Sequence, residues 1–193
     1  MKHRKPHTKP KLTAAQKEAV YALPLSQQFR IVHIDPCSGQ AVYQHELVDE
    51  TARDYRQVLT VAKAYARETV CAINPEVKPQ AEAARQKIFP GIEGFVNPDL
   101  TVEKYGYVDV KSPLSKAKIV RNANAANKQH AIAAITDLAL ENGELTVTEV
   151  EKFTDRIFSS QNSDDSGALN YTMNEVHWYV KGVLLKCNRP EKN

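Results

Sequence analysis

Cysteine is scarce in this chain of 193 residues, and a long hydrophobic run is absent. Cys37, Cys71 and Cys187 are odd in number and far apart, which argues against a disulfide framework and against a clustered zinc site. No run of about 18 apolar residues occurs, so we expect no membrane-spanning segment. The N-terminus is charged but is not followed by an apolar segment, so it does not resemble a secretory signal. We therefore expect a cytoplasmic protein with reduced thiols and no membrane partner.

Several motifs that identify enzyme families are also missing. The chain has no G-x-G-x-x-G and no Walker-type G-x-x-x-x-G-K loop, so nucleotide binding by a phosphate loop lacks support. It has no G-x-S-x-G elbow and no cysteine in a recognisable nucleophile context. His33 and His45 have no cysteine or carboxylate at metal-ligand spacing, so we interpret them as structural.

Charge is distributed unevenly along the chain. Residues 1–11 contain five Lys or Arg residues and no acid, so the rest of the chain carries a net charge of −2 although the whole carries +3. A short basic arm attracts phosphate without sequence preference, which makes nucleic acid a plausible partner. The alternative interpretation is a disordered, solvated terminus, for which richness in Lys and Pro is typical.

The order of predicted elements indicates an α+β protein with a small sheet, flanking helices and a helical N-terminal segment. Hydrophobic periodicity, caps and turns divide the chain into a basic disordered arm (1–11), a mainly helical segment with a short hairpin (12–90) and an α+β domain (91–193). Strands are predicted at 29–35, 41–44, 105–111, 131–137, 175–180 and 183–187. Helices are predicted at 13–23, 48–66, 80–88, 114–129 and 146–158.

One strand carries the most informative local pattern. Asp109 and Lys111 are two residues apart on a predicted strand and therefore share a face. Asp99 lies ten residues before Asp109, and a hairpin could fold it back beside them. Two carboxylates and a lysine at one point could hold Mg²⁺ and polarise a phosphodiester. The plain alternative is an exposed strand edge with alternating charges.

This pattern, written as Pro98-Asp99 and Asp109-Val110-Lys111, resembles the core motif of the PD-(D/E)XK nucleases. The resemblance implies a Mg²⁺-dependent nuclease in which Asp99 and Asp109 hold the metal and Lys111 assists.

A longer resemblance covers about residues 95–190. It rests on the strand ending Lys111-Ser112-Pro113, a helix closing on Gln129, the apolar strand 131–137 and the terminal hairpin 176–186. Together these look like the phage and polymorphic-toxin branch of the barnase–EndoU–colicin–RelE-like nucleases. That resemblance implies a metal-independent endoribonuclease without a cofactor, with RNA as partner and an immunity protein as a candidate second partner.

In such an enzyme the 2′-hydroxyl of RNA attacks the adjacent phosphorus with the help of a general base and a general acid. Lys111 is the candidate for phosphate stabilisation, and Asn122, Asn124 and Gln129 are candidates for hydrogen bonds to phosphate or base. His177 is the candidate acid or base because an unperturbed histidine has a pKa near neutrality. Each also has a structural interpretation: a solvated lysine, a helix-terminal glutamine and a histidine at the rim of the core beside Trp178.

A third hypothesis involves no catalysis. The chain could be a non-catalytic binding or assembly module, such as a phage-encoded or mobile-element protein that contacts nucleic acid through its basic arm. Removal of residues 1–11 would then abolish binding, whereas substitution of Lys111 would not.

Overall fold

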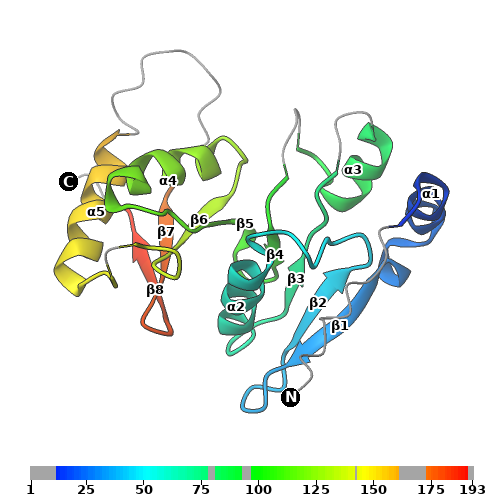
Figure 1. Cartoon of the computed structure of the whole chain (residues 1–193), viewed down its shortest axis with the longest axis horizontal. Helices are drawn as coiled ribbons and strands as arrows, with labels where there is room; N and C mark the ends of the chain where they lie inside the picture. The colour runs from blue at the N-terminus through cyan, green and yellow to red at the C-terminus, as the bar shows by residue number, and fades with distance from the viewer. Residues whose placement is uncertain (1–11, 78–80, 93–96, 142, 161–172, 191–193) are drawn as a thin grey trace, which may run out of the picture.

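A computed structural model describes residues 12–77, 81–92, 97–141, 143–160 and 173–190, which form a mixed α/β structure around one sheet (Figure 1). The described strands are β1 (Phe29–Ile34), β2 (Ala41–His45), β3 (Cys71–Ile73), β4 (Leu100–Val102), β5 (Gly106–Lys111), β6 (Ile132–Thr136), β7 (Glu175–Val180) and β8 (Val183–Asn188). The described helices are α1 (Ala14–Ala22), α2 (Tyr55–Tyr65), α3 (Glu82–Ile88), α4 (Ile119–Asn127) and α5 (Val147–Ser160), with 3₁₀ turns η1 (Leu25–Gln27) and η2 (Lys116–Lys118).

The eight strands follow one another across the sheet in chain order. The pairs β2/β3, β5/β6 and β6/β7 are parallel, and they are connected through α2, α4 and α5 respectively. The remaining neighbours are antiparallel. Parallel neighbours need a crossover connection, and these three helices form the crossovers.

Local sequence signals explain two of the element boundaries. The Thr13 side chain accepts a hydrogen bond from Gln16 N, and the Gln16 side chain accepts one from Thr13 N, which forms a capping box at the start of α1. At the β7–β8 turn, Lys181 and Gly182 both have positive φ angles, of 52° and 78°. A two-residue hairpin turn of this kind matches the natural twist of the strands it joins.

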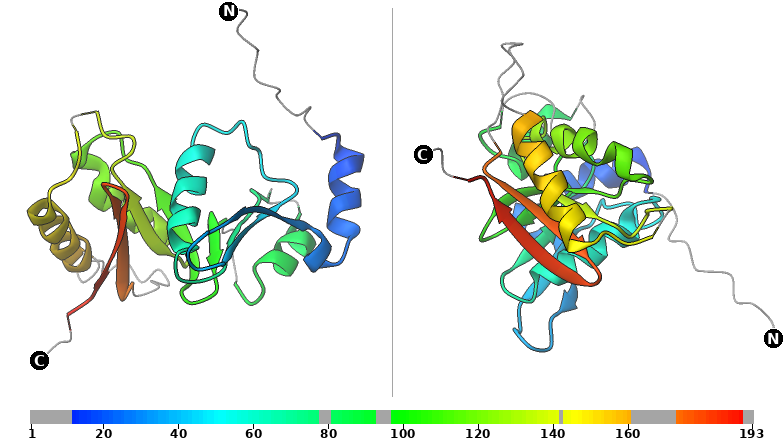
Figure 2. Two further views of the ribbon diagram at one scale, coloured as in Figure 1. Left: turned by 90° about the horizontal axis from the view of Figure 1, so that it is seen from below. Right: turned by 90° about the vertical axis from the view of Figure 1, so that its left-hand side faces the viewer.

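Strand β6 is buried on both faces, which explains its uninterrupted apolar sequence. Ile132 and Ala134 belong to a hydrophobic cluster that also contains the apolar residues of α2. Ala133 and Ile135 belong to a second cluster that contains those of α4 and α5, which lie side by side (Figure 2). The sheet therefore separates an α2 face from an α4–α5 face.

The six predicted strands are confirmed to within one residue at each end. The small sheet is not confirmed, because two further strands, β3 and β4, join the others into one eight-stranded sheet. The helical N-terminal segment is not confirmed either. Residues 12–90 contribute three strands besides α1, α2 and α3, and β3 pairs with β4 across residue 90. The predicted helix 48–66 begins only at Tyr55, because turns occupy the preceding residues.

Within the described part of the chain, no helix combines the length and the apolar character needed to cross a membrane. The basic arm, residues 1–11, lies outside the described residues.

Candidate active site

A cavity of about 450 Å³ opens at the edge of the sheet where β3 and β5 end and β4 begins. Open α/β sheets commonly bind ligands beyond the carboxyl ends of their strands, as here. Among the described residues that line it, five are acidic and one is a lysine: Asp49, Asp54, Glu76, Asp99, Asp109 and Lys111. A cavity lined in this way attracts cations and repels a bare phosphate.

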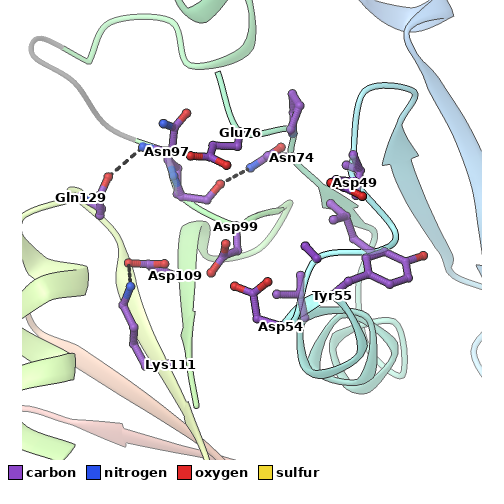
Figure 3. Close-up of a pocket in the computed structure, with 16 residues that line it drawn as sticks. Asp49, Asp54, Tyr55, Asn74, Glu76, Asn97, Asp99, Asp109, Lys111 and Gln129 are labelled. Carbon is purple, nitrogen blue, oxygen red and sulfur yellow. Dashed lines mark hydrogen bonds and ion pairs between the residues drawn. The ribbon is translucent and has the colours of Figure 1, made fainter. Parts of the chain in front are cut away.

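Three of these residues form what we call the carboxylate cluster: Asp99, Asp109 and Lys111. The carboxyl groups of Asp99 and Asp109 point toward each other (Figure 3). The Lys111 ammonium lies 2.7 Å from the buried Asp109 Oδ2 and forms an ion pair with it. Asp109 is only 3% exposed, and its side chain lines the cavity.

The β4–β5 hairpin brings the two aspartates together. Leu100 pairs with Val108, so Asp99, one residue earlier, is level with Asp109. The backbone N–H of Val110 donates a hydrogen bond to Asp99 Oδ2 at 2.8 Å. This contact fixes the Asp99 carboxylate against β5, as the hairpin anticipated from the sequence requires.

A second set of hydrogen bonds holds the segment that precedes β4. Asn74, directly after β3, donates from its backbone N–H to Asp99 O at 2.9 Å and from its side chain to Pro98 O at 3.0 Å. Asn97 donates its backbone N–H to Gln129 Oε1 at 2.7 Å. Gln129, predicted as a site residue, is therefore a cavity residue that fixes the chain leading into Asp99.

The electrostatic environment of Asp99 is unfavourable for a negative charge. Its removal from water is the largest cause, and the adjacent carboxyl of Asp109 is the next, so the pKa of Asp99 is raised well above its usual value. The hydrogen bond from Val110 and the positive charge of Lys111 act in the opposite direction but are weaker. A bound cation between the two carboxyls would remove this repulsion.

His177, the predicted acid or base, lies away from this cavity. It is 0% exposed, its Nδ1 is 2.5 Å from the Tyr65 hydroxyl, and its Nε2 is 2.7 Å from Glu175 Oε1. Burial lowers the pKa of His177, and the neighbouring Glu175 partly offsets this shift. We call His177, Tyr65 and Glu175 the histidine cluster; none of the three lines the cavity.

The two predicted asparagines of α4 are not among the cavity residues either. Asn124 donates a hydrogen bond from its side chain to Ser160 Oγ of α5 at 3.2 Å. Asn122 is half-buried on α4. Of the residues proposed from the sequence, the structure thus brings together Asp99, Asp109, Lys111 and Gln129, and it places His177, Asn122 and Asn124 elsewhere.

Sequence reasoning missed the polar residues that the β2–α2 connection and the end of β3 bring to the cavity. Asp54 precedes α2 without a side-chain capping bond, and its carboxylate lies on the side of Asp99 (Figure 3). Glu76 and Asn74 follow β3. The only sequence signal would have been β3 itself, whose three residues are too few to show a periodic pattern.

Comparison with protein-family models, curated proteins and solved structures finds no match to this chain. Among the described residues, no group of three or more His, Cys, Asp and Glu side chains is arranged to hold a metal ion. The carboxylate pair therefore has to be judged from its own geometry. Mg²⁺ usually retains several waters and is held by only one or two carboxylates, so a pair is a sufficient protein ligand set.

Proposed function

We propose that this protein hydrolyses phosphodiester bonds of nucleic acid with a divalent cation, most suitably Mg²⁺, held by Asp99 and Asp109. The observation that carries the proposal is the pair of facing carboxyls with Lys111 beside it in an acid-lined cavity. The same residues carry the sequence resemblance to the PD-(D/E)XK nucleases.

The residues fit such an ion. Asp109 is a buried carboxylate with the Lys111 ammonium at 2.7 Å, and Asp99 is a carboxyl whose ionised form is disfavoured until a further cation offsets the charge of its neighbour. Oxygen ligands of this kind are those that Mg²⁺ prefers. When bound, the ion would neutralise charge that develops on the phosphate.

The protein side chains contribute positioning and fixed charge. Lys111 is held by Asp109 at 2.7 Å, so its ammonium is directed into the site before a substrate arrives. A preorganised cation at the phosphate stabilises charge that forms in the transition state without further rearrangement. Asn74 and Gln129 keep the Pro98-Asp99 segment in place through the hydrogen bonds described above.

The geometry favours this function over metal-independent RNA cleavage. The latter needs an acid or base within hydrogen-bond reach of the phosphate that Lys111 stabilises. His177 is completely enclosed, is engaged by Tyr65 and Glu175, and is absent from the cavity lining. A substrate phosphate in the cavity would not contact it.

We further propose a cytoplasmic location. The three cysteines are unpaired, and Cys37 is exposed, which suits a reducing compartment.

The test is a cleavage assay on plasmid DNA, single-stranded DNA and total RNA with Mg²⁺, with Mn²⁺ and with EDTA. We expect cleavage with either metal and none in EDTA. Asp109→Asn should abolish it, whereas Asp155→Asn, an exposed carboxylate on α5, should not. The proposal would be contradicted by cleavage that continues in EDTA, or by the absence of cleavage of every substrate with both metals.

A further inference from the structure

The crossover that joins β5 to β6 has a charge composition unlike the rest of the chain. Between Asp109 and Asp137 the sequence contains no acidic residue and five Lys or Arg residues, and this is the longest acid-free stretch of the protein. The stretch includes α4, which packs on β5 and β6 next to α5. Positive charge is therefore concentrated on one connection that begins at the carboxylate cluster.

Three of these cations form a row on the outer face of α4. Arg121 and Ala125 lie within α4, and Lys118 and Lys128 flank it with helical backbone angles; all four are exposed. Their spacings of three, four and three residues place them on one side of the helix. The opposite side, with Ile119, Ala123 and Ala126, is buried in the core. We call Lys118, Arg121 and Lys128 the α4 stripe; it extends about 15 Å along the helix axis.

The α4 stripe is not explained by contacts within the protein. Within the part of the chain that the structure describes, none of its three side chains forms an ion pair, whereas the nearby Lys116 pairs with Glu149 at 2.5 Å. Nor does Lys118 stabilise its helix, because it lies at the N-terminal end, where the helix dipole disfavours a positive charge. A ligand of opposite charge would account for both features.

The position of α4 connects the stripe to the cavity. Asp109 and Lys111 pair with Ala133 and Ile135, so they lie on the sheet face that α4 covers. Lys128 is followed directly by Gln129, which lines the cavity. The other side of the cavity, from the β2–α2 connection and the end of β3, contributes Asp49, Asp54 and Glu76 and repels phosphate.

We propose that the α4 stripe binds the phosphate backbone of the nucleic acid strand that flanks the cleaved bond. This inference rests on the proposed function, because it assigns the path of that enzyme's substrate. A strand that leaves the cavity meets cations on the α4 side and carboxylates on the other, so its phosphates follow α4. Contacts of this kind bind without reading the bases.

The test is a fluorescence-anisotropy titration of labelled single-stranded DNA, duplex DNA and single-stranded RNA of one sequence, in EDTA so that no metal-dependent cleavage occurs. The variant carries Lys118→Ala, Arg121→Ala and Lys128→Ala, and alanine suits helix α4. We expect at least tenfold weaker binding of the preferred strand. The slope of log affinity against log salt should decrease by about 2 to 3, since each phosphate contact contributes about 0.7 to 0.9.

The matched control removes the same charge elsewhere, with Lys17→Ala, Lys63→Ala and Lys152→Ala, all exposed in the structure. Equal binding by the two triple variants would overturn the inference. A small substrate, bis(4-nitrophenyl) phosphate, does not reach α4, so the stripe variant should hydrolyse it at the wild-type rate with Mg²⁺. If the stripe variant lost binding but the wild type hydrolysed no substrate, the binding role of the α4 stripe would be supported and the proposed function would be refuted.

Discussion

Two clusters of ionisable side chains lie in the same sheet, the carboxylate cluster on the β4–β5 hairpin and the histidine cluster on β7, and they differ in how they are paired. In the histidine cluster the enclosed ring of His177 has the Tyr65 hydroxyl 2.5 Å from Nδ1 and one acid, Glu175, 2.7 Å from Nε2. In the carboxylate cluster two acids are placed against each other beside a cavity, and Lys111, 2.7 Å from Asp109 Oδ2, supplies a single positive charge for both.

This difference indicates a structural role for the histidine cluster and a chemical role for the carboxylate cluster. A buried polar group that is fully paired stabilises one arrangement of the core, and its removal leaves a partner unsatisfied. Two like charges that face a cavity destabilise the fold until something binds between them. We therefore expect substitutions in the histidine cluster to change stability without changing activity per folded molecule, and substitutions in the carboxylate cluster to change activity as well as stability.

After the loss of cleavage in Asp109→Asn, the largest effect is expected for Lys111→Ala. Loss of a fixed positive charge at the phosphate should reduce kcat per folded molecule by about 10²- to 10³-fold. The melting temperature should also fall, because the buried Asp109 carboxylate loses its ion-pair partner. Single-turnover cleavage with saturating Mg²⁺ measures this, and Lys152→Ala, an exposed lysine of α5, serves as control. A Lys111→Ala enzyme with wild-type kcat would remove Lys111 from the active site.

The next largest effect is expected for His177→Ala. The change leaves the buried Tyr65 hydroxyl without its partner and opens a cavity, so the free energy of unfolding should fall by about 2–4 kcal/mol. Tyr65→Phe should lower it by about 1 kcal/mol. Urea denaturation measures both values.

Activity per folded molecule should remain unchanged in both variants, since neither residue lines the cavity. If His177→Ala instead folded normally and lost RNA cleavage, the metal-independent mechanism would replace the one proposed above.

The smallest effect, and the only stabilising one, is expected for Asp99→Asn. The pKa of Asp99 is raised in the folded protein. The free energy of unfolding is therefore highest below the pKa that Asp99 has in the unfolded chain, and it falls as pH rises through the pKa that Asp99 has in the folded protein. The neutral amide of the variant does not lose stability in this way. At pH 8 without metal, the melting temperature of the variant should therefore be a few degrees higher than that of the wild type, which corresponds to about 1 kcal/mol in the free energy of unfolding.

Mg²⁺ should stabilise the wild type, because it binds only the folded carboxylate pair, and should not stabilise Asp99→Asn. Thermal melts from pH 4 to 9, with and without Mg²⁺, measure both effects. A wild-type protein whose stability rises with pH over this range without metal, relative to the variant, would contradict the assigned charge repulsion.

The sequence predicted the fold unevenly, for physical reasons. Strands of five or six residues, such as β1 and β7, are long enough to show alternation or an apolar run, and they were found. Strands β3 and β4 have three residues each and show neither, although they complete the sheet and frame the cavity. Turn residues before Tyr55 continue the apolar spacing of α2, so its start was placed too early.

The site was predictable where it is local. Asp99, Asp109 and Lys111 lie on one hairpin, so their spacing in sequence implied their proximity. Burial of His177 depends on β7 lying between β6 and β8 with Tyr65 of α2 against it, and no local pattern contains that information. The same holds for Asp54 and Glu76.

The β4–β5 hairpin also has a consequence for folding. All three residues proposed for catalysis lie between Asp99 and Lys111, so their mutual contacts have low sequence separation and can form early. An isolated two-stranded hairpin is marginal in water, however, and β4 has only three residues. Persistent order at the site therefore requires β3 and β6 on either side, and in hydrogen exchange the amide of Val110 should open only with the whole sheet.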